Sequence, residues 1–171
     1  MITDKQMLRI KAKELRKRLD MQAKSRLLCN KLRASEIYNE AKNIMIYYPL
    51  DHEINLLPLT DNVSKSFYLP RVNNDMLECC EYHAGDELKL SSYKVLEPVC
   101  SPSQKNIIDL AIIPALMCDK NNFRLGYGGG YYDRFLTNFC GITIACVPSE
   151  LIIDQLPIND YDIRMDYVIV A

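Results

Sequence analysis

Four of the chain's six glycines fall within residues 126–130, inside the short stretch 124–134. Glycine permits positive φ angles and the close approach of another group, but it costs entropy to order. Backbone N–H groups in such a turn can converge on a phosphate, and Arg124 can add a charge-assisted contact. Asp133 supplies the hard oxygen ligand that Mg²⁺ uses beside phosphates. These residue types favour an anion-binding loop, and the alternative is an ordinary glycine-rich connection.

Two generic phosphate-binding fingerprints do not fit this stretch. The dinucleotide fingerprint needs a third glycine where Tyr131 stands, and the phosphate loop needs a Gly-Lys-Ser/Thr sequence that is absent. Common nucleotide-binding patterns therefore do not explain the glycines.

Alternating apolar runs and turn residues predict the elements that must position this loop. The segment 109–113, which is apolar after Asp109 and is stopped by Pro114, predicts a strand buried on both faces, as in a parallel sheet. Further strands are expected at 44–48, 67–70, 142–147 and 166–170, with a strand at 76–82 and a small excursion at 88–93. Helices are expected at about 54–64 and 131–139.

This alternation predicts a single α/β domain spanning residues 1–171, with three α/β/α layers around a mostly parallel sheet. Ligands of such sheets bind at the carboxyl ends of the strands. Glu53, Arg71 and the glycine loop all follow predicted strands, so we expect them to meet there.

Residues 4–33 are expected to form one long helix or two consecutive ones, with an apolar stripe along one side. Residues 1–33 hold eleven Lys or Arg and three Asp or Glu, and Lys5, Arg9 and Arg16 share a line beside the stripe. This pattern is typical of a solvated basic face. A nucleic-acid surface is the alternative, but the segment lacks aromatic residues for base stacking.

The composition is that of a soluble globular protein, with 49% hydrophobic residues, 25% charged residues and a net charge of −1. No apolar run is long enough to cross a bilayer, and residues 1–6 lack the apolar core of a signal peptide, so we expect a cytoplasmic protein without a membrane partner. Seven scattered cysteines without a Cys-x-x-Cys pair argue against a disulfide framework or a zinc site.

The whole undecapeptide 124–134 (Arg-Leu-Gly-Tyr-Gly-Gly-Gly-Tyr-Tyr-Asp-Arg) resembles the signature of the 5-formyltetrahydrofolate cyclo-ligases, also called methenyltetrahydrofolate synthetases. The segments 109–116 and 162–166 match the family as well, and the similarity is collinear over residues 5–168. The resemblance implies a ligase that forms a C–N bond, converting 5-formyltetrahydrofolate to 5,10-methenyltetrahydrofolate with ATP as co-substrate and Mg²⁺ as cofactor. It also implies small-molecule substrates and no nucleic-acid partner. We expect a monomer.

The resemblance further implies roles for individual residues. Tyr48 and Glu53 match folate-contacting positions, and Asp133 and Asp166 match acidic positions assigned to Mg²⁺. The positions that match the family's ATP site are Lys5, Arg9, Arg71, Arg124, Leu125, Gly126, Tyr127, Gly128, Gly129, Gly130, Tyr131 and Tyr132. Five of these loop positions are also implied to lie close to the folate: Tyr127, Gly128, Gly129, Gly130 and Tyr131.

Two departures from the family pattern affect these roles. Some members carry a lysine where this chain has Gly129, so Arg124 and Arg134 become the expected catalytic cations, together with the metal. The segment between Leu19 and Ser25 is shorter than usual. That leaves a competing register in which Arg16 and its neighbours contact ATP instead of Lys5 and Arg9.

In the family's reaction, the formyl oxygen attacks the γ-phosphate of ATP, and N10 then closes the ring as phosphate leaves. Phosphoryl transfer needs positioning and electrostatic stabilisation more than a protein nucleophile, which fits a site of cations, acids and backbone N–H groups. Two other hypotheses remain. One is a different phosphate-handling enzyme, such as a sugar-phosphate isomerase, because a fold does not fix a function. The other is a folate- or nucleotide-binding protein without turnover.

Overall fold

Six strands form the central sheet of the structure, a computed structural model that describes residues 4–171. They run in the order β11–β9–β6–β1–β2–β3, and each neighbouring pair is parallel except β2 and β3. Their bounds are β1 Asn43–Met45, β2 Ser66–Asn73, β3 Met76–Tyr82, β6 Leu110–Ile113, β9 Ile142–Val147 and β11 Tyr167–Val170. The prediction of a mostly parallel sheet is confirmed.

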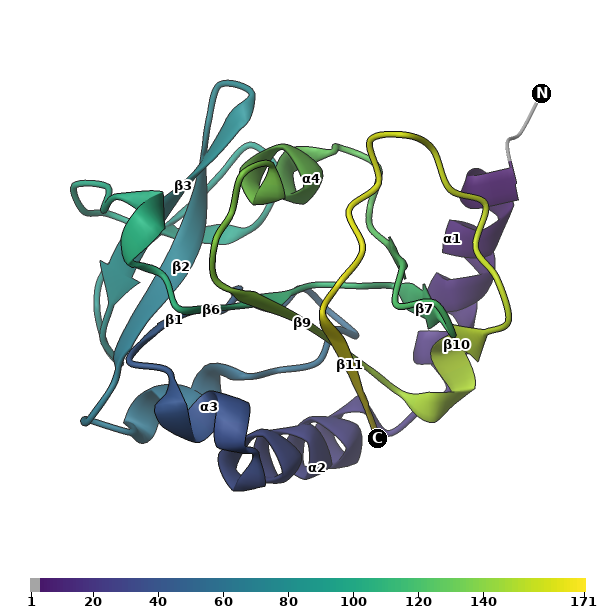
Figure 1. Cartoon of the computed structure of the whole chain (residues 1–171), viewed down its shortest axis with the longest axis horizontal. Helices are drawn as coiled ribbons and strands as arrows, with labels where there is room; N and C mark the ends of the chain where they lie inside the picture. The colour runs from purple at the N-terminus through teal and green to yellow at the C-terminus, as the bar shows by residue number, and fades with distance from the viewer. Residues whose placement is uncertain (1–3) are drawn as a thin grey trace.

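Helices lie on both faces of this sheet (Figure 1), with α2 (Met21–Ala34) and α3 (Glu36–Glu40) on one face and α4 (Tyr131–Leu136) on the other. Successive residues of a strand point to opposite faces, so each strand supplies two cores. Ile44 of β1 packs in the cluster with Leu28 of α2, whereas Met45 packs in the cluster with Phe135 of α4. The predicted α/β class with layered helices is thereby confirmed.

The N-terminal segment forms two helices, which is one of the two expected outcomes. Helix α1 (Asp4–Arg16) ends before a turn, and the side chain of Asp20 accepts a hydrogen bond from Ala23 N at 2.9 Å to start α2. An N-cap of this kind satisfies an amide that the helix leaves unpaired. The break lets α1 pack at the end of the sheet, near β7 (Met117–Asp119), instead of continuing along α2 (Figure 1).

One prediction for the middle of the chain was wrong, and the structure makes another more specific. The helix expected at about 54–64 is only the 3₁₀ helix η1 (Leu57–Asp61), where Pro58 stands at the start and lacks an N–H group. The excursion expected at 88–93 is half of a hairpin, β4 (Leu88–Leu90) paired with β5 (Leu96–Pro98). Short 3₁₀ turns, η2 (Lys105–Ile107) and η3 (Ser149–Leu151), precede β6 and follow β9.

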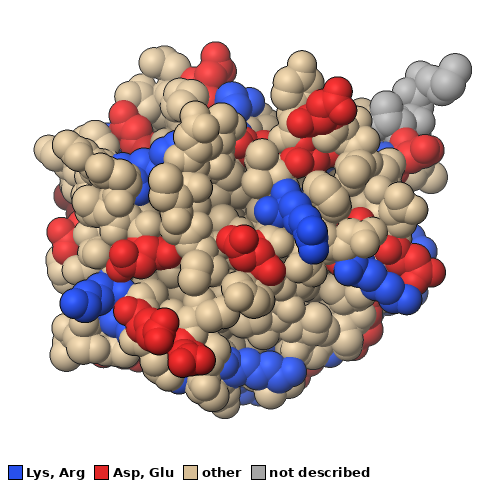
Figure 2. All heavy atoms as spheres, viewed as in Figure 1, with Lys and Arg blue, Asp and Glu red and all other residues tan. Residues whose placement is uncertain are grey.

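A second, three-stranded sheet carries the start of the glycine loop. It has the order β10–β7–β8, with β10 at Ile152–Ile153 and β8 at Arg124–Leu125. Acidic and basic side chains are interspersed over the face shown in Figure 2. Among residues 4–171, no helix is both long and apolar enough to cross a membrane.

Candidate functional site

A cavity of about 520 Å³ lies at the carboxyl ends of the parallel strands. Tyr47 and Tyr48, which follow β1, and Pro114, which follows β6, all line it. This is the edge at which open α/β sheets bind ligands, and the volume is typical of small-molecule sites. A cavity thus lies at the edge of the sheet where the sequence predicted a ligand site.

The glycine loop forms one side of this cavity, and its backbone requires glycine at two points. Gly128 has φ 107° and Gly130 has φ 68°, and both values lie in the left-handed region that disfavours side chains. A Cβ on Gly128 would also lie only 3.3 Å from the guanidinium carbon of Arg9. Arg9 Nε donates to Gly126 O at 2.8 Å, so the bare backbone lets α1 dock against the loop.

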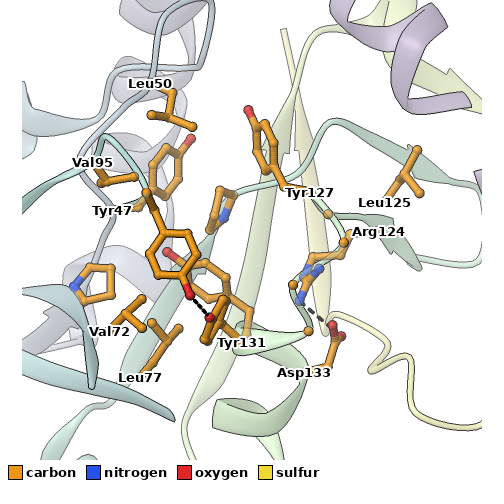
Figure 3. Close-up of a pocket in the computed structure, with 18 of the residues that line it drawn as sticks. Tyr47, Leu50, Val72, Leu77, Val95, Arg124, Leu125, Tyr127, Tyr131 and Asp133 are labelled. Carbon is orange, nitrogen blue, oxygen red and sulfur yellow. Dashed lines mark hydrogen bonds and ion pairs between the residues drawn. The ribbon is translucent and has the colours of Figure 1, made fainter. Parts of the chain in front are cut away.

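Arg124 and Asp133 face each other across this loop (Figure 3). Arg124 comes from β8 and its side chain is 4% exposed, while Asp133 comes from α4. Arg124 Nη2 donates to Asp133 Oδ1 at 3.1 Å, and its Nε has no partner among residues 4–171. A buried guanidinium with an unused donor can readily accept an anionic ligand.

Glu53 is the most buried carboxylate that lines the cavity, at 8% exposure. Its Oε2 accepts from Leu50 N at 2.7 Å, and its Oε1 accepts from the Tyr127 hydroxyl at 2.6 Å. Burial raises the pKa of Glu53, although these hydrogen bonds oppose the rise. Burial also raises the pKa of Tyr127, and the neighbouring Glu53 adds to that effect. Glu53 and Tyr127 thus form a hydrogen-bonded pair between the turn after β1 and the glycine loop.

Lys5 at the start of α1 also reaches the cavity, where it forms an ion pair with Asp162. Asp162 Oδ2 accepts from Asn159 N at 2.6 Å, and the next amide, Ile163 N, lies 3.4 Å from Asp133 Oδ1. The segment that carries Asp162 thus contacts Asp133, and both acidic residues line the cavity. Asp162 begins a segment that resembles the family, but no sequence pattern predicted a role for this residue.

The opposite side of the cavity is apolar and aromatic. Figure 3 shows Tyr47, Leu50 and Val95 across the cavity from Arg124 and Asp133. The turn between β4 and β5 contributes a tyrosine, Tyr93, which lies edge-on to Tyr131 with centroids 5.5 Å apart and whose hydroxyl hydrogen-bonds that of Tyr131. A flat ring system would find apolar contact on this side and charged groups on the other.

Most of the predicted site residues line this one cavity. They are Lys5, Arg9, Tyr48, Glu53, Arg124, Leu125, Gly126, Tyr127, Gly128, Gly129, Gly130, Tyr131, Tyr132 and Asp133. The structure thus brings together the residues matched to ATP and those matched to folate, while their contacts with either ligand stay predictions.

Two predicted cations lie outside the cavity lining. Arg71 Nη2 pairs with Glu78 at 2.8 Å, and its Nη1 donates to Cys100 O at 2.8 Å. Arg134 Nε donates to Asp75 O at 2.8 Å, and its guanidinium carbon lies 4.9 Å from the ring centroid of Tyr131. Both side chains already have partners, although the guanidinium of Arg134 lies against Gly130 and Tyr131 of the glycine loop.

Asp166 and Arg16 also lie outside the lining. Asp166 Oδ2 accepts from the backbone N and the Oγ1 of Thr143, both at 2.8 Å, which ties β11 to β9. Arg16 is buried at the end of α1, whereas Lys5 and Arg9 reach the cavity from the same helix. The geometry thus supports the register that uses Lys5 and Arg9.

The donors at the Asp133 end of the cavity fit Mg²⁺ better than a transition metal. No cluster of three or more His, Cys, Asp or Glu residues that could hold a metal occurs within residues 4–171. Mg²⁺ is commonly held by one or two carboxylates, with phosphate oxygens and water completing its shell. Asp133 and Asp162 provide such a carboxylate pair beside Lys5 and Arg124.

Comparison with known proteins identifies relatives over most of the chain. The model of the 5-formyltetrahydrofolate cyclo-ligase family matches residues 2–171. A 5-formyltetrahydrofolate cyclo-ligase from Mycolicibacterium smegmatis is 35% identical over 142 residues, which are 75% of this chain and 73% of the relative. The enzyme of that name from Haemophilus influenzae is 28% identical over 148 residues, 77% of each chain.

The fold has a solved counterpart as well. The NMR structure of the 5,10-methenyltetrahydrofolate synthetase from Aquifex aeolicus superposes with a TM-score of 0.87 at 26% identity. The match covers 98% of this chain and 90% of that protein. The likeness that the undecapeptide indicated therefore extends to the whole fold.

Proposed function

The chain belongs to the 5-formyltetrahydrofolate cyclo-ligase family, and we propose that it converts 5-formyltetrahydrofolate to 5,10-methenyltetrahydrofolate, consuming ATP in the presence of Mg²⁺. The observation that carries this proposal is the division of the cavity. One side is apolar and aromatic, and Arg124 lies across the cavity from it (Figure 3). Lys5 and Arg9 add two cations to the lining, through contacts with Asp162 and Gly126. The folate ring system suits the apolar side, and the phosphates of a nucleoside triphosphate suit the cations.

The chemical problem is the low reactivity of the formyl group. Its carbon is amide-like, so N10 attacks it slowly. Phosphorylation solves this problem when the formyl oxygen takes the γ-phosphoryl group of ATP and ADP leaves. N10 then bonds to the activated carbon, the C–O bond breaks, and the oxygen departs as inorganic phosphate with the N10 proton released.

Three cations of the cavity are suited to the phosphoryl step. Lys5 now pairs with Asp162, Arg124 with Asp133, and Arg9 with Gly126 O. Each can exchange that partner for a phosphate oxygen, and such electrostatic stabilisation is the main protein contribution to phosphoryl transfer. The guanidinium carbon of Arg124 lies 5.8 Å from the ring centroid of Tyr132, and this cation–π contact supports the orientation of Arg124.

We assign the Mg²⁺ site to Asp133 and Asp162, because both carboxylates line the cavity. When bound, the metal would neutralise the negative charge that the phosphates carry. The sequence-based assignment of Asp166 to the metal stays a prediction, as do those of Arg71 and Arg134 to the phosphates. None of these three side chains lines the cavity.

The folate is expected to lie on the apolar side. Glu53 is a buried acceptor suited to the N–H groups of the pterin ring, and a charged acceptor makes the stronger hydrogen bond. Tyr48 and Tyr131 line the same cavity and offer ring faces for contact. The Tyr127 hydroxyl donates to Glu53 Oε1. When the folate binds, this hydroxyl must either move away or share Oε1 with an N–H group of the folate.

The proposal is tested by mixing the purified protein with 5-formyltetrahydrofolate, ATP and Mg²⁺ and following the near-ultraviolet absorbance of the methenyl product. Reactions that omit ATP or Mg²⁺ serve as controls. We expect product only in the complete mixture. Product without ATP would contradict the phosphoryl step, and no product in any mixture would contradict the proposed conversion. A sugar-phosphate isomerase would show no nucleotide requirement with its own substrate.

A further inference from the structure

Arg16 is a buried arginine that the proposed chemistry does not use. It is the last residue of α1 and is 2% exposed. Its Nη1 donates to His52 O at 3.1 Å, and its Nη2 donates to Leu116 O at 3.2 Å and to Ala115 O. Within residues 4–171 no carboxylate forms an ion pair with it, and its Nε has no hydrogen-bond partner.

A buried cation without a carboxylate in direct contact costs free energy, because it has lost its hydration. Taking a charge out of water costs several kcal/mol, and apolar replacements of buried ionic groups are often neutral or stabilising. Stability alone therefore gives little reason for a guanidinium here. Its three acceptors are all backbone carbonyls, which points to a role in holding chain segments.

Those carbonyls belong to two segments that build the cavity. His52, with φ 62°, directly precedes Glu53 in the turn after β1. Ala115 and Leu116 follow β6, and Leu116 N donates to Leu125 O at 2.7 Å at the start of the glycine loop. One guanidinium thus joins the turn that carries Glu53 to the segment that carries the loop.

A second connection between these parts is the hydrogen bond from Tyr127 to Glu53, but it lies inside the cavity. A folate that binds Glu53 competes with Tyr127 for that oxygen. The Arg16 connection lies outside the cavity lining, so it can persist when a ligand enters. The positive charge of Arg16 also opposes the rise in the pKa of Glu53 that burial causes.

We propose that Arg16 is a positioning residue, which holds the Glu53 turn against the Leu116–Leu125 connection so that the carboxylate stays directed into the cavity. This inference rests on the proposed function, because it takes Glu53 as the folate acceptor. It assigns Arg16 no contact with ATP.

The test compares Arg16→Met and Arg16→Lys with a matched control, Arg18→Met, which removes an exposed arginine two residues away. We expect Arg16→Met to raise KM for 5-formyltetrahydrofolate about tenfold or more, since small displacements of a binding group are costly, and to leave KM for ATP within about twofold. Arg16→Lys should recover part of the loss, because an ammonium can still donate to carbonyls. The control should behave as wild type. Equal losses for both substrates would overturn the proposal.

A double variant separates positioning from a general effect on folding. In a Glu53→Gln background, Arg16→Met should add little further increase in folate KM, because both changes act through one group. The same increase in both backgrounds would contradict the proposal. If Arg16→Met does not fold, Arg16→Lys takes its place in the cycle.

A readout without turnover distinguishes failure of this inference from failure of the proposed function. The Glu53 amide donates to Leu50 O at 3.0 Å and should be protected from hydrogen exchange. Whether or not the wild type makes methenyl product, this amide should exchange faster in Arg16→Met than in Arg18→Met. Equal exchange in the two variants would refute the positioning role, and missing product in the wild type would refute only the proposed function.

Discussion

Replacing Glu53 by glutamine should separate folding from folate binding. The carboxylate is 8% exposed and accepts two hydrogen bonds, at 2.7 Å from Leu50 N and at 2.6 Å from Tyr127. Glutamine keeps the shape and one acceptor but removes the charge. The weaker hydrogen bonds are offset by the lost cost of burying a carboxylate, so the free energy of unfolding should change by about 1 kcal/mol or less.

Binding should respond much more strongly than stability. A hydrogen bond to a charged group contributes about 1.5–3 kcal/mol, and about 1.4 kcal/mol corresponds to a tenfold change in affinity. If the folate donates even one N–H group to Glu53, its affinity should fall by about ten- to a hundredfold. ATP affinity should stay close to wild type, because Lys5, Arg9 and Arg124 are unchanged.

The assay is calorimetric titration of wild type and Glu53→Gln with 5-formyltetrahydrofolate and, separately, with ATP and Mg²⁺. Thermal unfolding of the same samples reports stability. Wild-type folate affinity in a folded variant would refute the role of Glu53. A parallel loss of affinity for both ligands would show instead that Glu53 supports the whole cavity.

Four further predictions rest on the same site residues. Arg124→Ala should raise KM for ATP more than KM for folate and lower kcat about a hundredfold or more, which steady-state kinetics would measure. A larger rise in KM for folate than in KM for ATP would mean that Arg124 serves the folate and not the nucleotide. Asp133→Asn and Asp162→Asn should raise the Mg²⁺ concentration needed for half-maximal rate, whereas Asp166→Asn should not. If only Asp166→Asn raised that concentration, the assignment of the metal to Asp133 and Asp162 would be wrong. Because the pKa of Glu53 is raised, its protonation as pH falls should increase folate KM at acid pH in wild type but not in Glu53→Gln. The same raised pKa means that Glu53 contributes most to stability below its unfolded-state pKa, and that this contribution is lost as pH rises through its folded-state pKa. Denaturation at several pH values should therefore show wild type losing stability relative to Glu53→Gln over that rise.

The strands that the sequence predicted well are those whose burial is encoded locally. The run 142–147 is apolar except for Thr143 and matches β9, and the run before Pro114 matches β6. Continuous apolarity reflects burial on both faces of a parallel strand, and this signal lies within the few residues of the strand itself. The glycine loop could also be predicted from the sequence, because its glycines are concentrated in one short stretch. The structure explains this, since two of them adopt φ values that favour glycine.

The parts that sequence reasoning missed depend on distant partners. Tyr93 enters the site only because β4 pairs with β5 and places its turn beside Tyr131. Asp162 and Asp166 are both acidic and only four residues apart, and the difference between them is tertiary. Asp162 meets Lys5 at the cavity, whereas Asp166 is held by Thr143 of β9. No local pattern distinguishes these surroundings.

The central claim is that ATP activates the formyl oxygen, and transfer of that oxygen tests it most directly. The substrate would carry ¹⁸O in its formyl group, and the phosphate released during turnover would be analysed by mass spectrometry. We predict one ¹⁸O in each inorganic phosphate formed with methenyl product. Unlabelled phosphate accompanying the same amount of product would contradict the account, because the oxygen would then have left by another route.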